Sequence, residues 1–283
     1  MDDARTLVSA AWLKDHLDDP DLRVLDASWH MPTEGRDARA EYAARHVPGA
    51  RFFDIDEISD HRSDLPHMAP ETEKFVSRVR KLGVGDGHQV VVYDATGLFS
   101  AARAWWLFRL MGHDDVAVLD GGLPAWEAAG GAIEDMPPVI RDRHMTPRRQ
   151  NQMVAGIPEV ASASKLGHPQ LVDARSPGRF EGSEPEPRQG LASGHVPGSL
   201  NLHYRDLLRP DGRMKDEAGL RAAFEAAGVD LGKPVITTCG SGVTAAIITL
   251  ALARLGHADN TLYDGSWSEW GLHMQAETGP PAR

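Results

Sequence analysis

The one cysteine of this 283-residue chain lies where a thiol is readily activated. Residues 234–238 form an apolar, β-branched run that predicts a buried strand, and Cys239 follows directly. Gly240 and Gly242 then mark a short loop before a helical pattern that starts at Ala245. Backbone N–H groups of such a loop can converge on one point, and the positive end of the following helix adds to their field. This setting favours a nucleophilic thiolate over the inert, buried thiol that a lone cysteine otherwise suggests.

Internal duplication is the strongest sign of how the chain is organised. Four segments of the first half recur in the same order in the second half, about 145 residues further on. They are 25–27 with 172–174, 46–49 with 195–198, 119–122 with 263–266, and Trp126 with Trp270. Between the copies, residues 134–156 are rich in proline and arginine and show little periodicity, which is typical of a linker. We therefore expect two domains of one fold, residues 1–145 and 146–283.

Each copy alternates short apolar runs with helical patterns. The expected strands cover 22–26, 89–93 and 117–119 in the first copy and 170–173, 234–238 and 261–263 in the second. The expected helices cover 71–82, 101–111, 124–129, 217–227 and 245–255. This alternation predicts an α/β fold with two tandem doubly wound domains, each around a parallel central sheet. Ligands of such sheets bind at the carboxyl ends of the strands, which is where Cys239 is placed.

Composition and charge exclude several classes of function. The formal net charge of -11 argues against a nucleic-acid-binding protein, which needs clustered lysine and arginine. No apolar stretch is long enough to cross a membrane, and the acidic start resembles neither a secretory signal nor a transit peptide, so we expect a cytoplasmic protein without a membrane partner. A single cysteine excludes an intramolecular disulfide and a cysteine-rich metal site.

The loop sequence resembles a known family. Cys239–Thr244, read as Cys-Gly-Ser-Gly-Val-Thr, is similar to the active-site loop of the 3-mercaptopyruvate sulfurtransferases, a branch of the two-domain rhodanese family. The resemblance extends over nearly the whole chain and implies two tandem rhodanese-like domains, of which the second is catalytic. At the spacing of the repeat, Ala95 falls in the place of Cys239, so the first copy lacks a thiol and is expected to be non-catalytic.

The resemblance also implies roles for individual residues. Cys239 would carry the sulfur as a persulfide, without any metal or organic cofactor. Arg179 and Arg188 would hold the substrate carboxylate, since a guanidinium group binds a carboxylate through two parallel hydrogen bonds. The remaining expected members of the site are the loop residues Gly240, Gly242, Val243 and Thr244, and a Ser241–His67–Asp56 arrangement that would polarise the serine hydroxyl.

The substrate and the class of function leave alternatives. Thiosulfate-using members of the family tend to have basic residues after the cysteine, whereas Gly240 and Ser241 are neutral here, so 3-mercaptopyruvate is the favoured donor. The expected acceptors are cyanide or a thiol such as thioredoxin. A thiosulfate sulfurtransferase and a sulfur-relay binding module remain alternatives. A cysteine-dependent phosphatase is disfavoured, because Ala245 stands where such enzymes need an arginine to hold phosphate.

Overall fold

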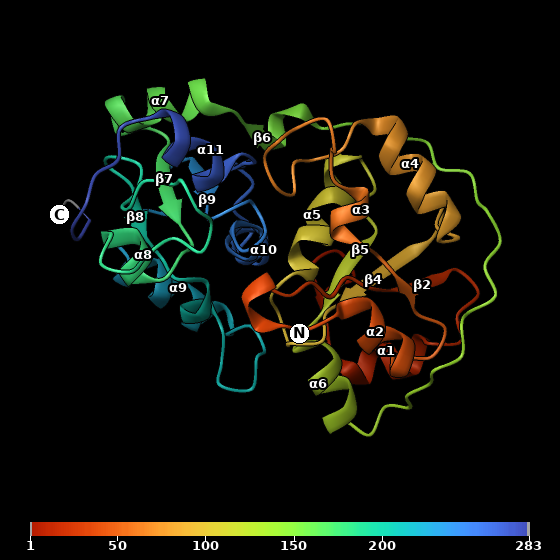
Figure 1. Cartoon of the computed structure of the whole chain (residues 1–283). Helices are drawn as coiled ribbons and strands as arrows, with labels where there is room; N and C mark the ends of the chain where they lie inside the picture. Colours follow the sequence, from red (N-terminus) through yellow and green to blue (C-terminus); the bar gives the residue numbers. More distant parts are fainter. Residues whose placement is uncertain (1, 282–283) are drawn as a thin grey trace. The chain divides into compact units, whose positions relative to one another are not determined.

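The computed structural model describes residues 2–281, which fold into two compact units (Figure 1). Unit 1 contains the residues up to Asp60, Ala69–Gln150 and Pro210–Met214. Unit 2 contains His61–Met68, Asn151–Arg209 and the residues from Lys215 onward. Two short segments cross over: His61–Met68 belongs to unit 2 although the residues on both sides of it belong to unit 1, and Pro210–Met214 belongs to unit 1 although its flanking residues belong to unit 2. The segment 61–68 brings His67 into unit 2.

Unit 1 is built on a parallel five-stranded sheet with the strand order β1-β5-β4-β2-β3. Its strands are β1 (Leu7–Val8), β2 (Leu22–Asp26), β3 (Arg51–Phe52), β4 (Gln89–Tyr93) and β5 (Val116–Leu119). Its helices are α1 (Ala10–His16), η1 (Pro32–Glu34), α2 (Ala38–Ala44), α3 (Ile55–Ile58), α4 (Thr72–Lys81), α5 (Ala101–Leu110) and α6 (Gly122–Ala128).

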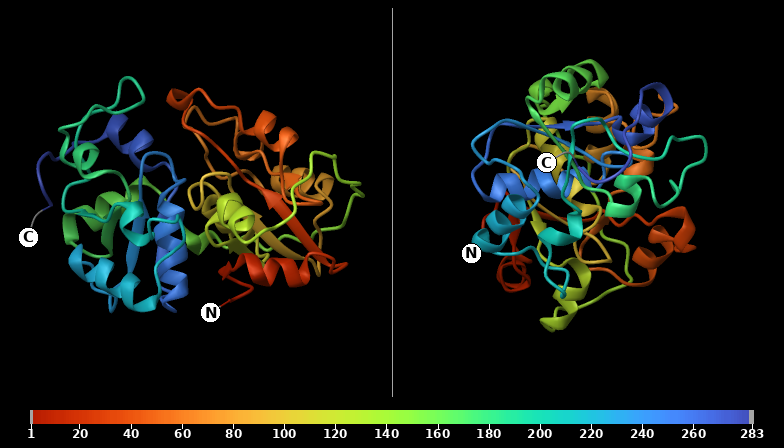
Figure 2. Two further views of the ribbon diagram at one scale, coloured as in Figure 1. Left: turned by 90° about the horizontal axis from the view of Figure 1, so that it is seen from below. Right: turned by 90° about the vertical axis from the view of Figure 1, so that its left-hand side faces the viewer.

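Unit 2 repeats this plan, with the strand order β6-β10-β9-β7-β8 and all pairs parallel. Its strands are β6 (Val154–Ala155), β7 (Gln170–Asp173), β8 (Leu200–Asn201), β9 (Val235–Thr238) and β10 (Asn260–Tyr263). Its helices are η2 (Asn151–Met153), α7 (Ile157–Leu166), α8 (Pro177–Glu181), η3 (Tyr204–Leu207), α9 (Glu217–Ala226), α10 (Ala245–Arg254) and α11 (Ser266–His273). Within each unit, helices lie on both sides of the sheet (Figure 2).

The expected central strands and helices are confirmed to within about two residues at each end. The central strands read as continuous apolar runs because both of their faces are covered by helices. Polar caps set several helix starts; Ser176, for example, accepts a hydrogen bond from the backbone N–H of Arg179 at the start of α8. The edge strands β1, β3, β6 and β8 were not predicted, because two residues are too short to show a period.

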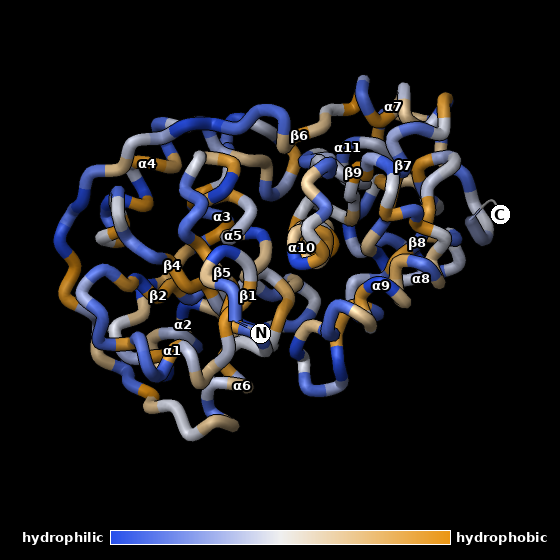
Figure 3. The backbone as a smooth tube through the Cα atoms, turned by 180° about the vertical axis from the view of Figure 1, so that it is seen from behind, coloured by the Kyte–Doolittle hydropathy of each residue, from blue (hydrophilic) through white to orange (hydrophobic). Residues whose placement is uncertain are grey.

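Each unit has its own hydrophobic core. Trp126 and Trp270, which the repeat pairs with each other, are buried in the cores of unit 1 and unit 2 respectively. In the hydropathy colouring of Figure 3, apolar residues gather on the central strands of the sheets and on α10. Among the described residues, no helix combines the length and apolarity needed to span a bilayer.

Candidate active site

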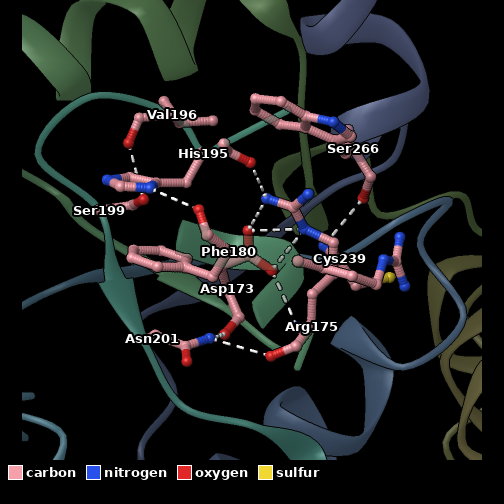
Figure 4. Close-up of polar contacts among 12 residues, drawn as sticks. Asp173, Arg175, Phe180, His195, Val196, Ser199, Asn201, Cys239 and Ser266 are labelled. Atoms are coloured by element: carbon pink, nitrogen blue, oxygen red, sulfur yellow. Dashed lines mark hydrogen bonds and ion pairs between the residues drawn. The ribbon is translucent and has the colours of Figure 1, made fainter. Parts of the chain in front are cut away.

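Cys239 directly follows the carboxyl end of β9, and hydrogen bonds join the backbone at Cys239 to the start of α11 (Figure 4). Its backbone N–H donates to Ser266 Oγ at 3.2 Å, and its carbonyl accepts from the N–H of Trp267 at 3.0 Å. The carbonyl of Gly240 accepts from the N–H of Ser268 at 2.9 Å. These bonds fix the loop backbone around Cys239, which is 2% exposed and in no disulfide.

The rest of the loop joins Cys239 to α10. Gly242 has a φ of +79°, in the left-handed region that a side chain makes costly, so glycine is required at this turn. Val243 is buried, and its carbonyl accepts the N–H of Ala246. The carbonyl of Thr244 accepts the N–H of Ile247, which starts the helix. The expected loop residues therefore shape the turn and the helix start beside the thiol.

Ser241 is placed between a histidine and an arginine. Its Oγ lies 2.8 Å from Nδ1 of His67, and Nη2 of Arg188 donates to the same oxygen at 3.3 Å. Both Ser241 and His67 are buried, and His67 has a φ of 61°, a strained value for a residue other than glycine. Since Arg188 uses an acceptor lone pair of Oγ, the hydroxyl proton remains available for a neutral His67 or for a substrate oxygen.

Asp56, the third expected member of that arrangement, is described in unit 1. It lies in the first turn of α3, and its carboxylate accepts a hydrogen bond from Nε1 of Trp29 at 3.0 Å. His67 belongs to unit 2. The part of Asp56 in the chemistry therefore stays a prediction from the family resemblance.

Arg179 and Arg188 both reach the loop at Gly240. A Cβ placed on Gly240 would lie 3.1 Å from Nη2 of Arg179 and 3.7 Å from Nη1 of Arg188. The two guanidinium groups thus converge directly over the residue that follows Cys239. Glycine at position 240 lets both cations approach the backbone this closely, and a guanidinium group can bind a carboxylate through two parallel hydrogen bonds.

Sequence reasoning missed a buried ionic cluster next to these arginines. Arg175 donates from Nη2 to Asp173 at 2.6 Å and from Nη1 to Glu186 at 2.8 Å, and its guanidinium lies 4.3 Å from the ring centre of Trp267. Glu186 also accepts from Nη2 of Arg179 at 2.6 Å. Asp173, Arg175 and Glu186 are almost fully buried, whereas Arg179 is partly exposed. Glu186 therefore connects the buried pair to the arginine that faces the loop.

The two carboxylates favour the charged form of Arg175. Burial alone would lower the pKa of Arg175, but the charges and hydrogen bonds of Asp173 and Glu186 outweigh it and raise the pKa above its ordinary value. A sequence signal for the cluster does exist. Asp173 ends a strand adjacent to β9, Arg175 follows two residues later, and polar residues at neighbouring parallel strand ends meet at one edge of the sheet.

The expectation that Ala95 is the counterpart of Cys239 in unit 1 is wrong by one residue. In the strand registers, Asp26 pairs with Tyr93 as Asp173 pairs with Thr238, so the residue that follows the strand is Asp94 and not Ala95. The sequence spacing was misleading because the loop before α5 is one residue longer than the loop before α10. The expectation that no thiol is present there is unaffected.

The loop between β4 and α5 in unit 1 directs its backbone N–H groups at the side chain of Asp94. Its carboxylate accepts hydrogen bonds from four backbone N–H groups, those of Thr96, Phe99, Ser100 and Ala101, at 2.8 to 3.0 Å. The loop at the start of α5 thus surrounds a negative charge with backbone donors, as a helix N-terminus allows.

We expect Gly240→Ala to weaken binding of a carboxylate substrate. The new Cβ would crowd Nη2 of Arg179, which Glu186 holds in place, so the arginine cannot give way without losing its partner. The KM of the donor should rise about three- to tenfold while kcat changes less, as steady-state kinetics can show. Gly232→Ala is the matched control: its Cβ would also lie 3.1 Å from a side-chain atom, Oδ1 of the exposed Asp230. Equal kinetics in both variants would contradict the carboxylate site.

Comparison with known proteins connects this geometry to a family. The model of the rhodanese-like domain matches residues 9–129 and again residues 157–273. A 3-mercaptopyruvate sulfurtransferase of Escherichia coli is 42% identical over 96% of this chain and 97% of its own length. A bovine thiosulfate sulfurtransferase is also 42% identical, over 97% of this chain and 94% of its own length. The crystal structure of SseA from Escherichia coli, described as a 3-mercaptopyruvate sulfotransferase, superposes with a TM-score of 0.85 at 41% identity and covers 93% of this chain and 99% of that one.

Proposed function

This chain belongs to the rhodanese family, with two tandem rhodanese-like domains, and on this premise we propose that it transfers sulfur from 3-mercaptopyruvate through a persulfide on Cys239. The observation that carries the proposal is the convergence of Arg179 and Arg188 over Gly240, next to the thiol. This arrangement suits a substrate with one carboxylate and a sulfur atom a few bonds away. Unit 2 is then the catalytic domain, and unit 1, with Asp94 in the place of the cysteine, is non-catalytic.

The first step forms the persulfide. The Cys239 thiolate attacks the sulfur of the donor, an S–S bond forms, and the C–S bond of mercaptopyruvate breaks with its electron pair moving onto carbon as the enolate of pyruvate. The proton of the donor's S–H group then moves to the enolate carbon, which gives pyruvate and leaves the persulfide as an anion. Ser241, held between His67 and Arg188, is the group we propose to donate a hydrogen bond to the developing enolate oxygen, with Asp56 supporting the histidine.

The persulfide is stabilised by the loop. The carboxylate of Asp94 in unit 1 is held by four backbone N–H groups, and Cys239 has the equivalent place before α10 in unit 2. A persulfide anion extends one atom beyond the thiol sulfur and would take the position of that carboxylate. The second step is attack of an acceptor on the outer sulfur, which restores the Cys239 thiolate. We propose cyanide or a reduced thiol such as thioredoxin as the acceptor, in the cytoplasm.

A thiosulfate sulfurtransferase is the second candidate, and the bovine relative of that name favours it. Thiosulfate carries two negative charges and no ketone. The neutral Gly240 and Ser241 provide no additional cation for it, whereas the Ser241 hydroxyl provides a donor for a ketone oxygen. The structure of the loop therefore supports mercaptopyruvate as the better donor.

The test compares the two donors on the purified full-length chain. Thiocyanate formation from cyanide is measured with 3-mercaptopyruvate and with thiosulfate over a range of concentrations. We expect kcat/KM to be at least about tenfold higher for mercaptopyruvate, equivalent to about 1.4 kcal/mol in transition-state binding. A preference for thiosulfate would show that the neutral loop does not determine the donor. Absence of turnover with both donors, together with uptake of sulfur from a persulfidated partner protein, would indicate the relay module instead.

A further inference from the structure

The two copies differ at the strand end next to the loop. In unit 2, Asp173 is paired with Arg175, and the guanidinium lies over Trp267. In unit 1 the equivalent carboxylate is Asp26, but the residue two positions later is Ser28, so the arginine is missing. The tryptophan is also replaced: the N–H of Leu123 bonds to the carbonyl of Asp94, as that of Trp267 bonds to the carbonyl of Cys239.

These two smaller side chains leave a cavity. A pocket of about 500 Å³ opens at this strand end in unit 1, with the polar residues Asp26 and Ser28 and the neighbouring Ala95 in its lining. Leu123, Pro124 and Tyr42 form apolar parts of its wall. The volume is in the range of small-molecule sites. The space that Arg175 and Trp267 fill in unit 2 is therefore open in unit 1.

The charges of the pocket do not balance. At its rim, Arg36 is paired with Glu41 and Arg45 with Glu127, so these four charges cancel. Asp26 remains. Its carboxyl is 2% exposed and accepts hydrogen bonds from the N–H and hydroxyl of Ser28 and from the hydroxyl of Tyr93, but it has no ion pair with any residue that the structure describes.

A buried carboxyl without a cation is costly. Burial raises the pKa of Asp26, and the negative charge of Asp94 adds to that rise, while the hydrogen bonds of Ser28 and Tyr93 oppose it. The ionised form would be stabilised by a positive group at the place that the Arg175 guanidinium takes in unit 2. The duplicated domain thus provides its own template for the missing partner.

We propose that the pocket of unit 1 binds a small molecule carrying a planar guanidinium or amidinium group, with that group on Asp26 and its apolar part against Leu123, Pro124 and Tyr42. A planar fork matches the carboxylate as Arg175 matches Asp173. The site is separate from the residues of the sulfur-transfer proposal, so neither proposal depends on the other.

Benzamidine and benzamide form a matched pair of probes, since they have nearly the same shape and differ in charge. Binding to the full-length chain is followed by ligand-observed NMR and by shifts of the backbone amides near Ser28. We expect benzamidine to bind with a Kd of about 1 mM or lower and benzamide at least about tenfold more weakly. Equal binding of the two probes, or no benzamidine binding at about 20 mM, would overturn the proposal.

Three variants locate the site. Asp26→Asn removes the charge at constant shape, Ser28→Arg introduces the arginine of the other copy, and Leu123→Trp introduces its tryptophan. Each is expected to weaken benzamidine binding at least about tenfold while leaving sulfur transfer unchanged, and the dispersion of the backbone amide signals of unit 1 reports whether it is folded. Undiminished benzamidine binding in folded Asp26→Asn would refute the site even if the two larger substitutions failed to fold.

Discussion

Replacing Cys239 with serine is expected to lower the rate of sulfur transfer by more than about 10⁴-fold with either donor. Cys239 is the one cysteine of the chain, and the backbone on both sides of it is held by Ser266, Trp267 and Ser268. Serine fits the same space and can form the same backbone bonds. The loss would therefore come from the chemistry of the side chain, since an alcohol is not ionised near neutral pH and cannot carry a sulfane sulfur.

The measurement has two parts. Thiocyanate formation gives the rate, and intact-protein mass spectrometry after exposure to mercaptopyruvate shows whether the chain gains the mass of one sulfur atom. The wild type is expected to gain it and Cys239→Ser is not. Ser241→Ala is the informative companion, because we expect it to keep the thiol and the persulfide but to lose about 10²-fold in kcat with mercaptopyruvate. Persulfide formation in Cys239→Ser would contradict the assignment of the nucleophile.

Replacing Arg175 with methionine is expected to destabilise unit 2 by about 3–5 kcal/mol. The substitution keeps much of the side-chain length but leaves Asp173 buried without its cation, and it takes one of two arginine partners from Glu186. Removing one member of a buried ion pair costs more than the pair contributes, because the remaining charge stays desolvated. The contact with the ring of Trp267 is lost as well.

Urea denaturation followed by tryptophan fluorescence measures this loss, and Trp267 beside the arginine is one of the seven tryptophans that contribute to the signal. Arg179→Met is the control. Arg179 is partly exposed, and Glu186 would keep Arg175, so we expect a loss of about 1 kcal/mol or less together with a clear rise in the KM of the donor. The two substitutions should thus differ in their effects: Arg175→Met lowers the stability of unit 2, and Arg179→Met weakens binding of the donor. A loss below about 1 kcal/mol for Arg175→Met would mean that Asp173 and Glu186 find other partners or protons.

The sequence by itself determined the central strands of both sheets and pointed to Cys239 as the predicted nucleophile. Apolar runs and helical periods located the central strands and five of the eleven α-helices in the described residues, because these patterns depend on neighbours a few residues away. The same local information marked Cys239, which follows a buried strand and precedes a glycine turn and a helix. The duplication was also visible, since both copies kept turns such as His46–Gly49 and His195–Gly198.

Only the tertiary structure decided which distant residues meet. The pairing of Arg175 with Glu186 depends on where the segment after α8 folds back. The contact of His67 with Ser241 joins residues 174 positions apart, and only the family resemblance suggested it beforehand. Neither follows from a local period. Strand register, which is set by hydrogen bonds between strands, was needed to identify Asp94 as the counterpart of Cys239. The pocket at Asp26 exists because two side chains of unit 1 are smaller than their counterparts, and a difference of volume becomes a cavity only when the surrounding elements are in place.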